Sequence, residues 1–212
     1  MTSWPGFSRW LVVAATTALL MVSCSRSYIV SRPEEQKLDD AYGQLFTREA
    51  ARAVQDGDIV LRRGYAVLSD VITLVTGGPD VSHAGIYDAT TGTVIEAVDS
   101  GVTERALADY VRGAHRVMIV RPELSASERR DAVRRARDEI GTGFDFSGFV
   151  GIDDPERFYC SELVAWAYRA QDRGYEVSGL IAPGDLVTLG PTIYDSGERG
   201  ERPLVAVATY WR

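Results

Sequence analysis

The sequence predicts an α+β fold in which an antiparallel barrel or sheet packs against helices. Runs of β-forming residues bounded by turn residues occur between residues 57 and 121, and two of them have the pattern of a hairpin. Apolar residues recur at helical spacing over Ser125–Ile140, directly after a capping-box pattern. With 212 residues, of which 45% are hydrophobic, the chain can bury one sizeable core.

The N-terminal segment is predicted to be a processed signal. Arg9 precedes the apolar run Trp10–Val22, which is shorter than the roughly 20 residues of a membrane span and fits a signal peptide. The run is followed by a small residue, Ser23, directly before Cys24. A small residue before a cysteine at the end of an apolar run resembles the signal of bacterial lipoproteins. That resemblance implies cleavage before Cys24 and acylation (palmitate) of its thiol. An ordinary signal peptide with an incidental cysteine is the alternative.

The predicted organisation is therefore a signal peptide over residues 1–24, a polar tether over 25–37 and one domain over 38–212. The expected location is the cell envelope, anchored to a membrane by lipid. Ser25 stands where an aspartate is associated with retention in the inner membrane, so the outer membrane is favoured if the host has two.

The domain is expected to begin with a helix followed by a core strand. Leu38, Tyr42 and Leu45 fall at positions i, i+4 and i+7, which predicts a helix over Leu38–Val54. The turn at Gly57-Asp58-Ile59-Val60-Leu61 then leads into the first core strand. A short helix over Ala66–Val75 follows. Its helical spacing is carried by Leu68, Val71, Ile72 and Val75, and Gly77-Gly78-Pro79 ends it.

A hairpin is predicted from Ser82–Tyr87 and Val94–Val98, joined through Thr91-Gly92. If the loop is residues 89–92, Asp88 faces Thr93 and His83 faces Val98. Glu96 then lies on the same face as His83, one diagonal step away. An odd loop length would place Glu96 on the opposite face.

The second half of the domain is expected to alternate strands and helices. Arg116–Arg121 is a third strand, and Ser125–Ile140 is a helix with the capping box Ser125–Glu128. The apolar stripe of that helix is formed by Val133, Ala136 and Ile140, and Gly141 and Gly143 close it. Pro155 suits the first turn of the next helix. Two late strands are expected near Asp185–Leu189 and Leu204–Tyr210.

The charge distribution argues against a nucleic-acid partner. The formal net charge is −7, whereas phosphate backbones are bound by basic surfaces. Acidic residues are interleaved with the one cluster of arginines, which predicts a solvated helix face. That cluster is Arg129, Arg130, Arg134, Arg135 and Arg137.

Cys160 is the only cysteine beyond the N-terminal segment. If Cys24 carries lipid, Cys160 has no partner for an internal disulfide. One cysteine and the two histidines of the chain also make a poor zinc site, and no metal site is predicted. The remaining interpretations are a small buried hydrophobe and a nucleophile. A helix N-terminus would lower the pKa of the thiol, and its amides could face an oxyanion if the helix begins at the cysteine.

The chain has two histidines, and His83 is the candidate base. His83 lies in the strand pattern VSHAGIYDA, where histidine is not a favoured residue, although an exposed edge position would also explain it. A Cys-His pair usually has a third group that orients the imidazole, and Glu96 on the partner strand is the candidate. An exposed strand acid is the alternative for Glu96. His115 is expected in a loop among solvated charges, outside the site.

The segments GDIVLRRG, SHAGIY, VIEA and FYCSEL together resemble the circularly permuted papain-like hydrolases. These are the YiiX-like branch of the NlpC-type cell-wall peptidase superfamily, distantly akin to lecithin retinol acyltransferase. The resemblance spans about residues 57 to 190, and the order of His before Cys is the permuted order. It implies Cys160 as nucleophile, His83 as base and Glu96 as orienting residue. Tyr159 and Ser161 flank the nucleophile without an assigned role.

By that resemblance the chain is expected to be a thiol hydrolase of amide, ester or thioester bonds. Cell-wall peptides are the leading substrate class, and no metal or organic cofactor is needed. A lipid acyltransferase or thioesterase is a variant with the same chemistry. A catalytically idle binding module at the envelope is the alternative from another class.

Overall fold

The computed structural model describes residues 29–76, 78–148, 154, 156–173 and 180–210. The predicted signal peptide, with Cys24, lies outside the described residues, and so does Pro155. Within the described part of the chain, no helix has both the length and the apolar character needed to cross a membrane.

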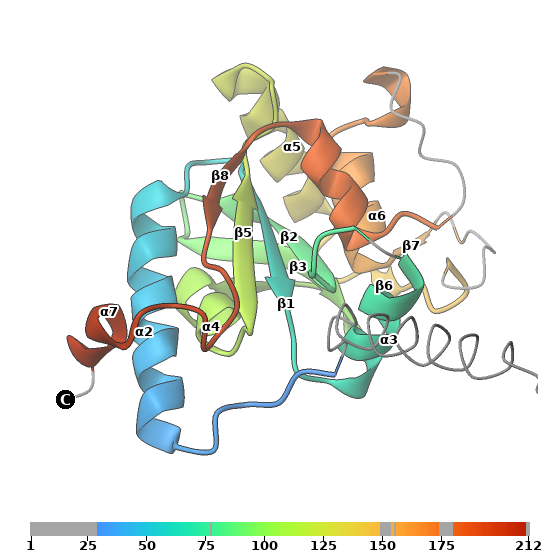
Figure 1. Cartoon of the computed structure of the whole chain (residues 1–212). Coiled ribbons are helices and arrows are strands. Elements are labelled where there is room, and N and C mark those ends of the chain that lie inside the picture. Colours follow the sequence, from blue (N-terminus) through green and yellow to red (C-terminus); the bar gives the residue numbers. More distant parts are fainter. Residues whose placement is uncertain (1–28, 77, 149–153, 155, 174–179, 211–212) are drawn as a thin grey trace, which may run out of the picture.

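A six-stranded sheet in the order β4-β3-β2-β1-β5-β8 forms the centre of the molecule (Figure 1). All of its neighbouring strands are antiparallel. The edges β4 and β8 are not joined, so the sheet alternative of the predicted fold is correct and the barrel is not. The strands are β1 (Ile59–Arg63), β2 (His83–Asp88), β3 (Thr93–Val98), β4 (Gly101–Ala106), β5 (Arg116–Val120) and β8 (Thr192–Asp195). The short strands β6 (Gly143–Phe144) and β7 (Arg157–Phe158) pair in parallel outside this sheet.

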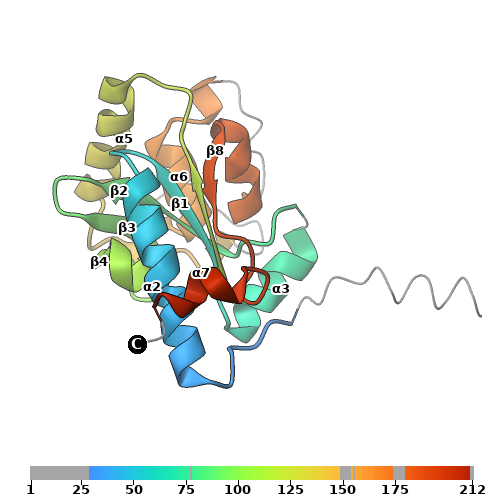
Figure 2. The same ribbon diagram turned by 60° about the vertical axis from the view of Figure 1, so that its left-hand side comes forward.

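Helices cover both faces of the sheet, as the two views in Figures 1 and 2 show. On one face lie α2 and α4, with α7 packed against α2, and on the other lie α5 and α6. The helices are α2 (Gln36–Ala53), α3 (Val67–Thr76), α4 (Leu107–Arg112), α5 (Ala126–Asp138), α6 (Cys160–Ala167) and α7 (Leu204–Ala208). Two 3₁₀ helices, η2 (Gln171–Arg173) and η3 (Pro183–Leu189), follow α6.

The strands bury side chains on both faces because helices lie on both. Ile59 and Leu61 belong to the core under α5 and α6, whereas Val60 between them belongs to the core under α2 and α4. The same alternation of period two runs along β5. A strand between two apolar layers reads as a continuous hydrophobic run, which is the pattern of the Ile59-Val60-Leu61 segment.

The first helix and the capped helix of the second half are confirmed with small shifts of their ends. Ser125 caps α5 and exchanges hydrogen bonds with Glu128 as a capping box. Ile140 lies past the end of α5 and is 39% exposed, so the predicted apolar stripe ends at Ala136. In α2, Gly43 lets α4 approach closely, since a Cβ there would lie 2.8 Å from the Cγ of Arg112.

Three predicted elements are wrong. The helix expected from Pro155 begins at Cys160, because Arg157–Phe158 pairs with Gly143–Phe144 and Phe158 is buried. Residues 185–189 form part of η3, where Asp185 accepts a hydrogen bond from the Ala182 amide. Residues 204–208 form α7, which lies on α2 and therefore does not extend the sheet.

Candidate active site

Cys160 is the first residue of α6 and follows an extended N-cap, Tyr159. The side chain is buried, with 5% of Cys160 exposed. The backbone amides of the first helical turn have no acceptor within a helix. α6 packs against β2 and β3, so its N-terminus is held at the sheet. The lone thiol therefore lies where a helix begins and where the field of the helix favours an anion.

The two residues that flank Cys160 fix the chain beyond α6. The hydroxyl of Tyr159 accepts a hydrogen bond of 2.9 Å from the Ile181 amide, and the hydroxyl of Ser161 donates one of 2.7 Å to the Ile181 carbonyl. Both hydroxyls are thus engaged with one peptide backbone. Their observed role is to hold the segment that leads into η3 against the start of α6.

His83 and Glu96 are in direct contact. Asp88 pairs with Thr93, as the four-residue loop predicts, and this register places Glu96 within reach of His83. The imidazole Nε2 lies 2.5 Å from the Glu96 carboxylate, which is fully buried. The predicted geometry of these two residues is therefore confirmed, and the alternative of an exposed acid is wrong. With Nε2 facing Glu96, Nδ1 is the ring nitrogen left for the thiol.

The paired ladder between β2 and β3 ends before it reaches His83. Their described ladder comprises the pairs from Asp88–Thr93 to Ile86–Ile95, whereas β3 continues to pair with β4 as far as Val98. The amide of Ala84, beyond the last pair, faces the sulfur of Cys160 and lowers the pKa of the thiol. This amide, which in a continuing ladder would donate to β3, therefore stabilises the thiolate.

The thiol and the imidazole shift each other's pKa in the direction of an ion pair. Burial alone would raise the pKa of Cys160, but the charge of His83 and hydrogen bonds from His83 and Ala84 lower it below its ordinary value. Burial alone would lower the pKa of His83, but Cys160 and the hydrogen bond to Glu96 raise it. Both shifts favour thiolate with imidazolium over thiol with neutral imidazole.

Glu96 stays ionised despite its burial. Burial alone would raise its pKa, but the hydrogen bond to His83 and the charges of His83, Arg62 and Arg105 lower it. The guanidinium of Arg105 lies 2.7 Å from Oε1 of Glu96, and that of Arg62 lies 3.8 Å from Oε2. The carboxylate can therefore remain charged and stabilise an imidazolium on its other side.

Sequence reasoning missed the residues that surround this acid. Arg62 stacks over the ring of Tyr110 at 4.6 Å, and the Tyr110 ring centroid lies 5.8 Å from that of His83. Arg105 and Tyr110 lie on β4 and α4, which were not predicted as elements. The signal for β4 is the second edge of β3. If β3 is an inner strand, as the burial of Glu96 requires, another strand must pair with it, and that strand is β4.

His115 lies outside this site, as expected, but its predicted exposure is wrong. Only 6% of His115 is exposed, because it begins the turn into β5 and the ring of Tyr65 packs edge-on against it at 5.5 Å. The aspartate of the GDIV segment, Asp58, is also structural, since Arg121 binds both of its oxygens at 2.8 and 2.9 Å.

Comparisons with known proteins agree with this fold. The family model described as "Permuted papain-like amidase enzyme, YaeF/YiiX, C92 family" matches residues 53–198. A solved structure, the metalloprotein YiiX from Escherichia coli O157:H7, is 22% identical, with a TM-score of 0.54 over 71% of this chain and 99% of that one. At that identity the likeness shows the fold alone. No curated protein matches the chain.

The family match covers most of the chain and includes both segments that meet at the site, SHAGIY and FYCSEL. The order of His83 before Cys160 is that of a permuted papain-like protein. The chain therefore belongs to the YaeF/YiiX family of permuted papain-like amidases and is a hydrolase of the cysteine peptidase or amidase type.

Proposed function

We propose that the chain hydrolyses acyl bonds with Cys160 as nucleophile, His83 as general base and Glu96 as the residue that positions the imidazole. The observation that carries this proposal is the chain of contacts from the first residue of α6 through His83 to a buried carboxylate. Each member supplies what nucleophilic catalysis requires, namely an activated thiolate, a base within reach and a group that fixes its orientation.

In the proposed reaction, His83 takes the proton of Cys160 and the thiolate attacks the acyl carbonyl carbon. The resulting tetrahedral oxyanion collapses, the bond to the leaving amine breaks, and the imidazolium donates its proton to that amine. Water, deprotonated by His83, then attacks the thioester and releases the acid and the free thiol. The amides of the first turn of α6 are the proposed donors to the oxyanion, because the helix begins at Cys160.

The pH dependence of thiol alkylation tests the proposed pair. Since His83 and Ala84 lower the pKa of Cys160, iodoacetamide should label it at a lower pH than an ordinary thiol. Below that pKa the protonated thiol reacts slowly, and above it the rate reaches a plateau. The His83→Ala variant loses the stabilising charge and keeps the burial, so its labelling midpoint should move above that of an ordinary thiol. Labelling rates measured by mass spectrometry between pH 5 and 10 provide the profile.

The groups that face this pair are Glu96, Arg62, Arg105 and Tyr110, and none is altered in His83→Ala. Free cysteine labelled in the same buffers gives the reference curve. A wild-type midpoint equal to that of free cysteine, and unchanged by His83→Ala, would favour the catalytically idle binding module.

Replacing Glu96 by Gln should slow hydrolysis by about 10²- to 10⁴-fold, by analogy with loss of the orienting carboxylate in other triads. The amide keeps the size of the side chain but no longer stabilises the imidazolium, so the pKa of His83 should fall and the labelling midpoint of Cys160 should rise. Steady-state rates and the labelling profile together test the positioning role.

The matched control is Glu104→Gln, which changes an exposed acid on the neighbouring strand that binds Thr93 and Arg137. It should leave both the rate and the labelling midpoint unchanged. Equal effects of the two substitutions would show that Glu96 acts only by adding negative charge to this part of the sheet, and not by contact with His83.

Cell-wall peptides are the proposed substrates, and the proposed setting is the cell envelope with Cys24 acylated. Support comes from the lipoprotein-like sequence around Cys24 and from the resemblance to cell-wall peptidases. In a host with two membranes, we place the chain at the periplasmic face of the outer membrane. Mass spectrometry of the mature N-terminus, before and after Cys24→Ala, would show whether a diacylglycerol-sized mass is attached there.

Acyl lipids are a second candidate substrate class, and one observation favours them. The helix α3 exposes an apolar face next to the sheet end that holds His83, a surface suited to lipid. This face comprises Val67, Leu68, Val71 and Leu74, which are between 47% and 79% exposed. Incubation with purified cell-wall peptides and, separately, with phospholipids, followed by mass spectrometry, distinguishes the two. Released amines indicate peptide cleavage, and released fatty acid indicates lipid cleavage.

A further inference from the structure

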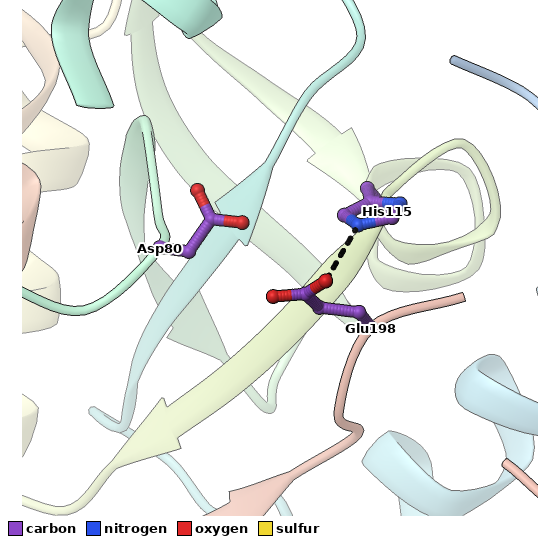
Figure 3. A group of neighbouring side chains, drawn as sticks. All are labelled: Asp80, His115 and Glu198. Carbon is purple, nitrogen blue, oxygen red and sulfur yellow. Dashed lines mark ion pairs between the residues drawn. The ribbon is translucent and has the colours of Figure 1, made fainter. Parts of the chain in front are cut away.

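Three potential metal ligands converge at the end of the sheet that also holds His83, but they gather around β5 and β8 and not around the thiol. One ligand atom each from Asp80, His115 and Glu198 lies within 4.8 Å of the other two (Figure 3). Nε2 of His115 and Oε2 of Glu198 form an ion pair at 3.6 Å. Asp80 precedes β2, His115 precedes β5 and Glu198 follows β8, so the cluster exists only in the folded chain.

The imidazole of His115 lacks hydrogen-bond partners within the described part of the chain. Neither Nδ1 nor Nε2 makes a hydrogen bond, although the residue is only 6% exposed. Burying a polar group without a partner costs about 1–3 kcal/mol. In Figure 3 the ring edge with Nε2 faces Glu198, on the side of the cluster. The buried ring therefore points a nitrogen that makes no hydrogen bond, and only a 3.6 Å ion pair with Glu198, toward the cluster, an arrangement that a bound cation would stabilise.

Two arginines hold the ligands in place without entering the cluster. Arg63, fully buried, donates to Oδ1 of Asp80 at 2.7 Å and also binds Asp70 at 2.5 Å. Arg199 donates to the Ala114 carbonyl at 2.7 Å, and its own amide donates to the His115 carbonyl at 2.9 Å. These bonds fix the segments that carry the three ligands, as preorganised metal sites require.

We propose that Asp80, His115 and Glu198 bind a divalent transition-metal ion, for which Zn²⁺ is the probe. One imidazole nitrogen with two carboxylate oxygens suits Zn²⁺ or a similar ion better than Ca²⁺ or Mg²⁺, which prefer oxygen ligands alone. Three protein ligands leave a further position for water. Access is from the side of Glu198, whose side chain is 33% exposed.

The ion would connect the active-site strand to the C-terminal part of the sheet. Asp80 lies in the segment that leads directly into His83, and Glu198 follows the edge strand β8. A metal held between them fixes the entry into β2 without contacting the thiol. Its role in this position is to stabilise the fold around the site, separately from the acyl chemistry of Cys160.

Metal retention measured in a Cys160→Ser background tests the proposal, because that background removes the thiolate as a competing zinc ligand. After equilibration with micromolar Zn²⁺ and gel filtration, elemental mass spectrometry should find one Zn²⁺ per chain. Adding Glu198→Gln or His115→Gln should weaken binding at least about 100-fold, since loss of an outer-shell partner alone costs 10- to 100-fold. Co²⁺ should give visible absorption in the Cys160→Ser protein.

The second histidine of the chain provides the matched control. His83→Gln in the same background should retain one Zn²⁺, because His83 lies at the other site. Zinc should also raise the thermal midpoint of the Cys160→Ser protein and leave that of Glu198→Gln unchanged, which gives a readout if His115→Gln fails to fold. Absence of bound zinc in the Cys160→Ser protein, or full retention after Glu198→Gln, would overturn the assignment.

Discussion

Replacing Cys160 by Ala should reduce hydrolysis by at least about 10⁴-fold, the scale seen when the nucleophile of an acyl-transfer triad is removed. In the proposed mechanism the thiolate forms the bond to the acyl carbon, and Cys160 is the thiol whose charge raises the pKa of His83. The rate should be measured on whichever substrate the wild-type chain cleaves, and the acyl-enzyme should be sought by mass spectrometry. A thioester adduct of about the acyl mass should form on wild-type protein and not on Cys160→Ala.

Ser161→Ala is the control for this substitution. It removes a hydroxyl next to the thiol, 4.0 Å from its sulfur, and costs the hydrogen bond to the Ile181 carbonyl. Turnover should fall far less than in Cys160→Ala, and the acyl adduct should still form. Persistent hydrolysis by Cys160→Ala, with unchanged kinetics, would remove Cys160 from the mechanism.

The largest expected effect on stability comes from replacing Arg63 by Met. The side chain is fully buried, and its guanidinium binds the carboxylates of Asp80 and Asp70. Methionine fills a similar length of apolar space but leaves the buried carboxylate of Asp80 without its cation. Removal of one partner of a buried pair costs about 3–5 kcal/mol. Urea unfolding in the presence of a chelator should show this loss of free energy.

Arg116→Met provides the comparison, because Arg116 also binds an aspartate, Asp195, at 2.5 Å. That aspartate is 34% exposed, so water can replace the lost partner. The expected cost is about 1 kcal/mol or less. Equal losses in the two variants would mean that burial does not set the contribution of Arg63.

The local patterns that correctly predicted the contact between His83 and Glu96 and the cap of α5 depend on short distances along the chain. The loop of residues 89–92 sets the register of the hairpin, and that register puts His83 beside Glu96. The capping box at Ser125 is likewise formed by residues three positions apart. Such features depend on turn length and on the spacing of neighbouring residues, and both can be counted in the sequence.

The missed features depend on contacts between distant segments. Gly101–Ala106 alternates small, polar and charged residues, and it is a strand because Glu96 and its neighbours pair with it. His115 is buried because β1, β5 and the segment after β8 close around it. Counts of cysteine and histidine do not reveal the proposed metal site, because carboxylates supply two of its three ligands.

The assembly of the thiol site from separate parts of the chain makes chemical reactivity a signal of tertiary structure. His83 and Glu96 come together within one hairpin, whereas Cys160 joins them only when α6 packs on β2. Until then, the thiol has neither the imidazolium nor the Ala84 amide beside it and behaves as an ordinary cysteine. If Cys160 is the nucleophile, as proposed, a newly made chain is thus inert toward acyl bonds until its C-terminal half has folded. The appearance of fast alkylation during refolding would time that last step directly.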